Sequence, residues 1–481
     1  MRKFFVGNIV FLLLVNLVVK PVWIFGIDRN VQNFVGHAAY GQYQAILSFC
    51  IIFQIFLDFG LQNFNNRTVA QSPEVIQTLF PNILWAKVFL SLGYYALLFL
   101  LGFLIGFRGH ALWLLLLLGF VQILSSLVLY LRSNVSALHR FKMDSLLSVS
   151  DKLIMIIICG VLLYLPPWSR HFRIEWFVYA QIVSYFLTAL IAFVTCIKLS
   201  RLKWHRFHPQ KAWAICKQSL PYAILIFSMS VYLRADSVIL ERLLPDGKEQ
   251  AGIFAASFRL LDAANNFTGV LFAGILLPMF GRLLAKKEAV QPLVRQSVNL
   301  LLPVAFTTVA IAIFWGNDIM QVLYRDMTGY DAKIFAVIMC AYPGFCIGYV
   351  YATLLTANGN LRPLIYVALI AVTINLGLNF ILIPRTGALG AAYSCAITQV
   401  FLSIVNIWLA GRYIRLKKDF GWVLQYLAFI VLMVIVGILL DKSGWSLSFK
   451  LLGMAVNGLL CMMICGFVPF AKILQITKTA T

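Results

Sequence analysis

Residues 39–70 read AYGQYQAILSFCIIFQIFLDFGLQNFNNRTVA, and residues 250–285 read QAGIFAASFRLLDAANNFTGVLFAGILLPMFGRLLA. In each stretch a glycine near the start opens a long apolar run, and an arginine followed by small or apolar residues closes it. The glycine-to-arginine distance is about one helical turn longer in the second stretch than in the first. The two stretches predict an internal repeat, with one long apolar helix in each copy.

The composition of the whole chain excludes a water-soluble globule. Its 481 residues are 62% hydrophobic and 12% charged, and the mean hydropathy is +0.89. An ordinary soluble domain is about 45–50% apolar and about 25% charged. Since a membrane helix needs about 20 apolar residues, the apolar windows predict fourteen spans, at residues 4–26, 38–61, 81–105, 111–131, 146–166, 175–197, 218–243, 251–281, 296–315, 334–356, 362–384, 387–410, 420–440 and 448–469. The longest connections, 198–217 and 316–333, are too short to house a soluble catalytic domain.

The surplus of basic residues indicates the orientation in the membrane. The chain has 39 lysines and arginines against 17 acidic residues, a formal charge of +22. Roughly twice as many basic residues fall on the side of the N-terminus as on the other side, and cytoplasmic loops retain lysine and arginine. We therefore expect both termini in the cytoplasm, and we attribute the charge to topology rather than to nucleic-acid binding. The basic loop 198–217 could also contact anionic lipid head groups.

The repeat predicts how the spans are grouped. Spans two and eight start from the same side, so the copies are parallel repeats about an axis along the membrane normal. We expect an N-lobe at residues 1–215, containing spans 1–6, and a C-lobe at residues 216–411, containing spans 7–12. Residues 412–481 would add two further spans.

Four groups of motifs carry a resemblance to a known family. They are GHAAYGQY at 36–43, DFGL at 58–61 with NRTVA at 66–70, RAD at 234–236 with AGIFAA at 251–256, and NLGLN at 375–379 with IP at 383–384 and GALGAA at 387–392. Over about residues 5–410 the chain resembles the polysaccharide flippases, the O-antigen and capsule branch of the multidrug, oligosaccharidyl-lipid and polysaccharide (MOP) exporter superfamily. Ala251 and Phe254 depart conservatively from the family's usual Val-Gly-x-Tyr.

The resemblance implies an all-α polytopic membrane protein with two six-helix lobes in the V shape of the multidrug exporters (MATE). It implies a transporter that moves undecaprenyl-diphosphate-linked oligosaccharide from the inner to the outer leaflet of the bacterial inner membrane by alternating access. Neither a cofactor, a metal site nor catalytic residues are expected, and a coupling ion would be H⁺ or Na⁺. Its partners would be the lipid-linked glycan and polysaccharide-assembly proteins.

Three cations within the expected spans are the candidate substrate-binding residues. From the rise of about 1.5 Å per residue, Lys20, Arg234 and Arg259 lie about 9, 14 and 12 Å below the outer ends of their spans. Charges inside a membrane usually face a bundle interior or a wet cavity, and arginine binds phosphate through two aligned hydrogen bonds. We expect the three to form one anion site for the diphosphate. Lys20 precedes Pro21, which removes a backbone donor and frees a carbonyl, so the helix should bend there.

Other polar residues in the spans allow two interpretations. Asp262 and Asn266 continue the helix face of Arg259, either as a stripe along the cavity or, for Asp262, as a partner that merely neutralises the arginine. Asp236 would bind a coupling ion or pair with another helix. Asp58, near the inner end of its span, would be a structural partner or a gate.

The remaining intramembrane charges and the cysteines favour structural roles. Lys87 and the pair Asp151–Lys152 lie close enough to the inner interface for their side chains to reach it. The nine cysteines form no Cys-x-x-Cys pair and no zinc-ligand pattern with the histidines.

Three other functions compete with the flippase interpretation. Within the superfamily they are a drug or cation antiporter, which would depend on buried carboxylates, and a peptidoglycan-precursor flippase, whose usual arginine-rich opening differs from this one. A polytopic glycan polymerase, ligase or acyltransferase would need a large external loop or a buried catalytic histidine, and the sequence shows neither.

Overall fold

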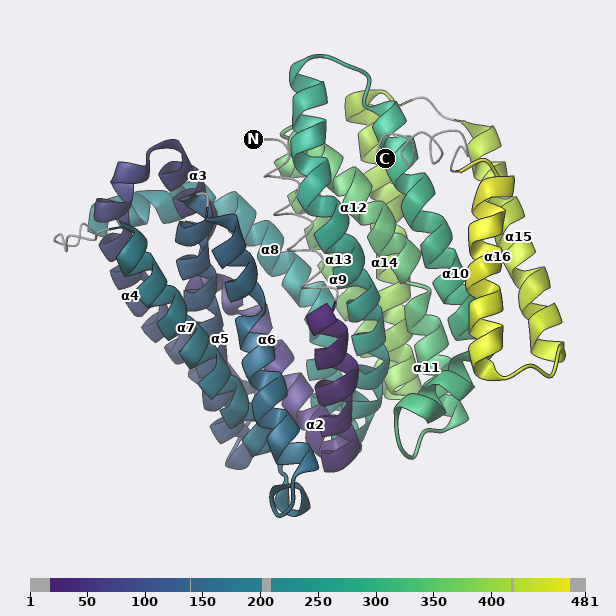
Figure 1. Ribbon diagram of the computed structural model, residues 1–481, viewed down its shortest axis with the longest axis horizontal. Coiled ribbons are helices and arrows are strands. Elements are labelled where there is room, and N and C mark those ends of the chain that lie inside the picture. Colours follow the sequence, from purple (N-terminus) through teal and green to yellow (C-terminus); the bar gives the residue numbers. More distant parts are fainter. Residues whose placement is uncertain (1–17, 139, 201–208, 417–418, 468–481) are drawn as a thin grey trace. The chain divides into compact units, whose positions relative to one another are not determined.

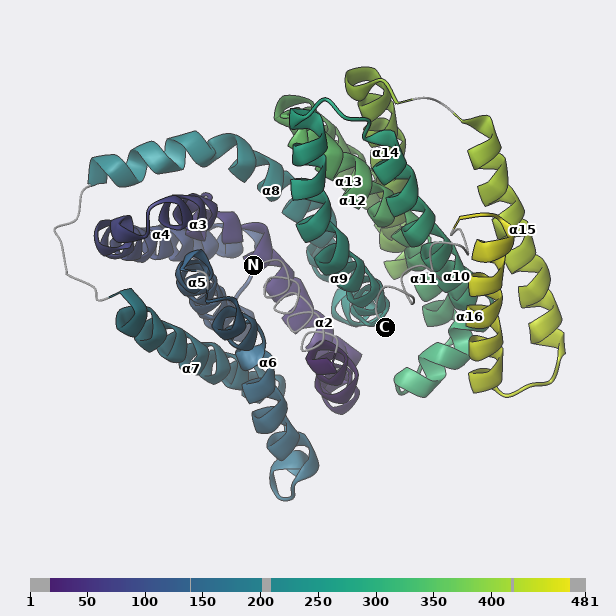
Figure 2. The same cartoon turned by 45° about the horizontal axis from the view of Figure 1, so that its top comes forward.

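The fold is seen in a computed structural model, which describes residues 18–138, 140–200, 209–416 and 419–467. Every regular element in these ranges is a helix (Figures 1 and 2). A helix satisfies its own backbone hydrogen bonds, which the hydrocarbon of a bilayer cannot do. The expected all-α class is confirmed.

Contacts divide the chain into two compact units, Met1–Ala255 (unit 1) and Ala256–Thr481 (unit 2). The division falls after the expected lobe boundary at 215/216, because helix α8 packs closely on α2. The lobe boundary, which follows from the repeat, stays a prediction. Unit 1 contains, in order, η1 (Val22–Asp28), α2 (Arg29–Ile52), η2 (Gln54–Leu57), α3 (Leu61–Gln71), η3 (Pro73–Val75), α4 (Ile76–Ile105), α5 (His110–Ala137), α6 (Phe141–Tyr164), η4 (Trp168–His171), α7 (Ile174–Ser200) and α8 (Pro209–Leu243).

Helix α9 (Gly247–Ala285) begins in unit 1 and continues in unit 2. The other helices of unit 2 are α10 (Gln291–Leu323), α11 (Gly329–Met339), α12 (Tyr342–Ala357), α13 (Leu361–Thr386), α14 (Ala388–Ile414), α15 (Phe420–Lys442) and α16 (Leu447–Ile464).

The described helices agree with the fourteen expected spans. Eleven are long and apolar enough to cross a membrane, with α11 and α12 counted as one. Helices α2 and α9 correspond to the spans expected at 38–61 and 251–281. Most of the first expected span, 4–26, lies outside the described residues. The chain is a multi-pass membrane protein.

The core of unit 1 lies where α3, α4, α5 and α7 meet (Figure 1). Phe80 on α4 and Tyr130 on α5 are fully buried, and the Tyr130 hydroxyl donates to the Phe80 carbonyl at 3.1 Å. Other faces of α4 expose large apolar side chains such as Phe89 and Leu92. In a membrane protein these faces suit the lipid.

The first two spans are joined by irregular backbone. The π-helix η1 starts directly after Pro21. Gly36 has a φ of 80°, a left-handed value that glycine adopts without strain, and it breaks the helical path inside α2. π-helical turns are frequent at functional sites.

The last two helices are fastened to α10 (Figure 2). The side-chain oxygen Oδ1 of Asn299 on α10 accepts hydrogen bonds from Trp422 Nε1 at 2.6 Å and from the Tyr426 hydroxyl at 2.8 Å, both on α15. At the other end, Trp315 Nε1 donates to Asp441 Oδ1 at 3.1 Å. Both ends of α15 are therefore attached to α10 by hydrogen bonds.

Candidate functional site

The second span is broken at the DFGL motif of residues 58–61. Helix α2 ends at Ile52, the 3₁₀ turn η2 follows, and α3 begins only at Leu61. Phe59 and Gly60 take left-handed φ values of 43° and 84°. Broken backbone at membrane depth is tolerated only where protein groups or water satisfy it. The residues that satisfy this break therefore determine whether the span can exist in this form.

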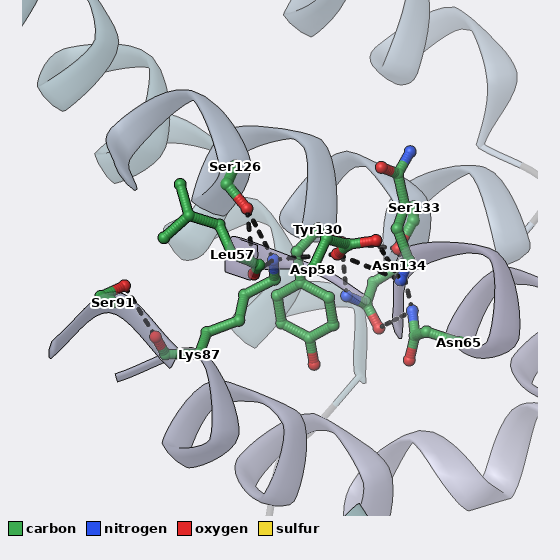
Figure 3. Close-up of polar contacts among 10 residues, drawn as sticks. Leu57, Asp58, Asn65, Lys87, Ser91, Ser126, Tyr130, Ser133 and Asn134 are labelled. Atoms are coloured by element: carbon green, nitrogen blue, oxygen red, sulfur yellow. Dashed lines mark hydrogen bonds and ion pairs between the residues drawn. The ribbon is translucent and has the colours of Figure 1, made fainter. Parts of the chain in front are cut away.

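Lys87 of α4 provides hydrogen bonds to polar groups at this break (Figure 3). Its Nζ donates to the Leu57 carbonyl at 3.2 Å, to Asp58 Oδ1 at 3.0 Å and to Ser126 Oγ at 2.8 Å. The side chains of Lys87 and Asp58 are 6% and 24% exposed. The Asp58 carboxylate also accepts from the Gln62 backbone N–H, 3.3 Å from each oxygen, at the start of α3. A buried ion pair thus bridges α4 and the break.

This pair corrects one expectation and answers another. The Lys87 side chain does not extend to the inner interface, because its ammonium group lies among η2, α4 and α5. Asp58 has the structural partner that its position suggested. The pairing was missed because the two residues are 29 positions apart on separate elements. The sequence feature that could have indicated this pairing is an acidic and a basic residue, Asp58 and Lys87, in consecutive apolar spans.

A row of polar side chains on α5 extends the ion pair toward α3. Ser126, Tyr130, Ser133 and Asn134 occupy one helix face, and the Lys87 Nζ lies 5.8 Å from the centre of the Tyr130 ring. From α3, Asn65 Nδ2 donates to Ser133 Oγ and Asn134 Oδ1, each at 3.0 Å (Figure 3). The network ties η2, α3, α4 and α5 together, so α3 should move with α4 and α5.

A second charged pair lies in the same unit. Lys152 of α6 is 3.2 Å from Asp151 Oδ2, and it lies 3.4 Å from the Tyr185 hydroxyl of α7 and 5.2 Å from the centre of the Trp23 ring. Its side chain is 28% exposed. The expectation that Lys152 would reach the inner interface is therefore wrong, since its ammonium group is directed at η1 and α7.

The glycines of the repeat meet at the expected outer end of unit 1. A Cβ added to Gly41 of α2 would overlap the carbonyl oxygen of Lys248 and the nitrogen of Gly252, and a Cβ added to Gly252 would overlap the His37 carbonyl oxygen. Gln32 Nε2 also donates to the Gly252 carbonyl at 2.9 Å. Glycine is required at both positions because the backbones touch.

Beside the glycine contact, α8 is fastened to the turn between α4 and α5. Arg242 Nη1 donates to the Gly106 carbonyl at 3.2 Å, and the guanidinium lies 4.0 Å from the centre of the buried Phe107 ring. Glu241, whose side chain is 2% exposed, accepts from Arg242 Nη2 at 3.0 Å. We call this contact, with Gly41 and Gly252, the outer closure.

The structure places the three predicted cations without testing their grouping. Lys20 and Arg234 are half-buried in unit 1, and Arg259 is 9% exposed in unit 2. The shared anion site stays a prediction.

The other predicted polar residues differ in burial. Asp236 is fully buried on α8, Asp262 is half-buried and Asn266 is exposed on α9. Asn266 Nδ2 donates to the Asp262 carbonyl at 2.8 Å, one helical turn away. The stripe that starts at Arg259 thus runs from a buried to an exposed position. In the part of the chain that the structure describes, histidine, cysteine and acidic side chains form no group of three that could hold a metal.

Comparison with known families shows which family the chain belongs to. The family model described as "Polysaccharide biosynthesis protein" matches residues 5–284, more than half of the chain. The chain belongs to the polysaccharide biosynthesis protein family. No curated protein gives a significant match to it.

Solved structures show which fold this polysaccharide biosynthesis protein has. A lipid II flippase MurJ in an inward closed conformation superposes with a TM-score of 0.71 at 13% identity, over 96% of this chain and 100% of that one. An inward-facing MATE family multidrug transporter of the MOP superfamily has a TM-score of 0.61 at 12% identity, over 82% and 96%. A MOP superfamily transporter from Pyrococcus furiosus, described as having a binding pocket of reverse polarity, has a TM-score of 0.59 at 14% identity, over 86% of this chain and 96% of that one. The fold is that of the MOP transporters.

Proposed function

We propose that this transporter moves undecaprenyl-diphosphate-linked oligosaccharide from the cytoplasmic to the periplasmic leaflet of the bacterial inner membrane, by alternating access. Membership of the polysaccharide biosynthesis family carries the substrate class. The MOP transporter fold supports the transport step. The positive-inside pattern supports cytoplasmic termini, which place the outer closure at the periplasmic side.

The substrate requires cations for its diphosphate within a chain that is otherwise apolar. Lys20, Arg234 and Arg259 have matched depths along their helices, and arginine binds phosphate through two aligned hydrogen bonds. We assign them the diphosphate, with Asp262 and Asn266 continuing the polar face of Arg259. Asp236, buried on α8, is the candidate for a coupling H⁺ or Na⁺.

Release to the periplasm requires the outer closure to open. Its centre is the backbone contact of Gly41 and Gly252, where no side chains interlock. Side-chain attachments at this contact include Gln32 to Gly252 and Arg242 to Gly106. The contact is close enough to seal the outer end, and these attachments must break when it opens.

The test is reconstitution of the full chain in proteoliposomes that contain undecaprenyl-diphosphate-linked oligosaccharide. A lectin added outside reports how fast the glycan becomes accessible. If Arg259 donates two charge-assisted hydrogen bonds to the diphosphate, Arg259→Ala should slow flipping by about 100-fold or more. Arg259→Lys should recover part of the rate, since a point charge replaces the planar fork.

Controls separate substrate binding from simple neutralisation of Asp262. Arg170→Ala, which removes an exposed arginine in η4, should leave flipping unchanged. If Arg259 only neutralises Asp262, Arg259→Ala lowers protein abundance, and adding Asp262→Asn restores both abundance and transport. Normal transport by that double variant would remove Arg259 from the anion site.

A second candidate is a peptidoglycan-precursor flippase, because the MurJ structure superposes over its whole length. Complementation distinguishes the two functions. We expect rescue of surface polysaccharide in a strain that lacks its repeat-unit flippase, and no rescue of growth in cells depleted of the lipid II flippase. Rescue of growth alone would favour the second candidate, and export of a cationic dye alone would favour a drug antiporter.

A further inference from the structure

A pocket of about 540 Å³ lies in unit 1 beside the outer closure. Its walls are the start of α2, the turn between α4 and α5, and the end of α8 with the turn into α9. The volume lies within the range of about 300–1,000 Å³ that is usual for small-molecule sites. All lining residues belong to unit 1.

The lining is polar and balanced in charge. Three basic residues, Arg108, Arg242 and Lys248, face three acidic ones, Glu241, Asp246 and Glu249. Gln42 and His110 add further polar groups, and the other lining residues are alanine, glycine and proline. Because no large apolar side chain lines the pocket, it suits neither a lipid tail nor an apolar drug. Because its charges balance, it favours neither an anion nor a cation.

Several lining groups are held in place by their neighbours. Arg242 is fixed by Glu241, Gly106 and Phe107. Arg108 Nη1 donates to the Phe107 carbonyl at 3.0 Å, and its guanidinium lies 3.5 Å from the centre of the Phe103 ring. Because these side chains are already held, they lose less conformational entropy when a ligand binds.

We infer that this pocket binds one or two neutral sugar residues at the outer face. A sugar hydroxyl both donates and accepts, so it matches a lining that offers ammonium and guanidinium donors together with carboxylate acceptors. The inference rests on the proposed function for the source of the sugar, which is either the glycan of the lipid-linked unit after transport or a free periplasmic saccharide.

Occupancy of the pocket has a consequence for transport. Gln42, Arg108 and His110 stand on one side of the outer closure, and Glu241, Lys248 and Glu249 stand on the other. Opening the closure separates these walls, so a sugar that contacts both binds the closed state more tightly. By linkage the sugar then favours closure. Saccharide that accumulates outside would slow the next cycle.

The test measures protection of a cysteine in the pocket wall. In the full chain with its nine native cysteines replaced, Ala38→Cys places a thiol at an exposed lining position. Its rate of reaction with a membrane-impermeant maleimide is followed with glucose, galactose, mannose, rhamnose or N-acetylglucosamine. At twice the dissociation constant a protecting sugar slows the reaction about threefold. Sodium phosphate and choline chloride serve as charged comparison ligands.

Matched variants show where protection arises. Ser443→Cys, an exposed position between α15 and α16, should react at the same rate with and without sugar. Glu249→Gln and Lys248→Met, which change lining groups, should weaken protection of Ala38→Cys by about tenfold in sugar concentration for one lost charge-assisted hydrogen bond. Protection by phosphate or choline alone, by no sugar of the set, or equally at Ser443→Cys would overturn the inference.

The two sources of sugar, and the two proposals, are distinguished in proteoliposomes. If free sugar protects Ala38→Cys and slows flipping when added outside, the site accepts free saccharide. If protection appears only while lipid-linked glycan is being transported, the site receives the transported unit. Flipping without any protection refutes the sugar site and leaves the proposed function intact. Protection without flipping of that substrate refutes the proposed function and leaves the sugar site intact.

Discussion

Replacing Lys87 by methionine tests whether the ion pair at the break of the second span holds unit 1 together. The change keeps most of the side-chain volume and removes three hydrogen bonds, to Leu57, Asp58 and Ser126. It also leaves the Asp58 carboxylate without its positive partner among protein groups. Removal of one partner from a buried ion pair costs about 3–5 kcal/mol. We expect the lower end, because Asp58 is 24% exposed and retains some solvation.

A double-mutant cycle separates the pair from the rest of the network. Asp58→Asn with Lys87→Met removes both charges, so it should cost less than Lys87→Met alone, about 2 kcal/mol or below. Unfolding of the purified protein is followed by circular dichroism in mixed micelles as the fraction of denaturing detergent rises. Lys248→Met, at an exposed position, is the matched control and should stay within about 0.5 kcal/mol of wild type.

Two results would refute this reasoning. A cost of Lys87→Met below about 1 kcal/mol would place the pair among weak, solvated ion pairs. Additive costs of the two single changes in the double variant would show that the charges do not interact.

Three further predictions concern the outer closure, the last helices and the topology. Gly41→Ala should push α2 away from the start of α9 and lower the stability of the closed state. Gly93→Ala is the control, because a Cβ added there has no atom within 4 Å, and it should have no such effect. Thermal unfolding and flipping rates of the two variants check this. Asn299→Leu removes the acceptor of Trp422 Nε1 and of the Tyr426 hydroxyl on α15. It should lower the free energy of unfolding by about 1–3 kcal/mol in the same micelle assay. A neutral result would mean that α15 is held by apolar packing alone. A cysteine at Gln210 should react with an impermeant reagent only after cells are permeabilised, and labelling in intact cells would reverse the orientation.

The family and the class of fold were accessible from the sequence alone. The apolar windows predicted the helices, since each helix satisfies its own backbone hydrogen bonds and only its length and hydropathy matter to the bilayer. The glycines of the repeat were also visible, because a repeat is a property of the chain. Their role was not visible, since the need for glycine at positions 41 and 252 follows only from the contact between the two backbones.

The tertiary structure alone decided the partners of the buried charges. Counting residues along the helix gives the depth of Lys87 but not the direction of its side chain. The rotation of α4 and the break at Asp58 determine whether its ammonium group faces lipid, the interface or a carboxylate. The same holds for Lys152, which is directed at Tyr185 and Trp23. Hydropathy is summed along one helix, whereas a buried charge is stabilised by groups from several helices. The choice of those groups depends on packing between segments that are far apart in the chain.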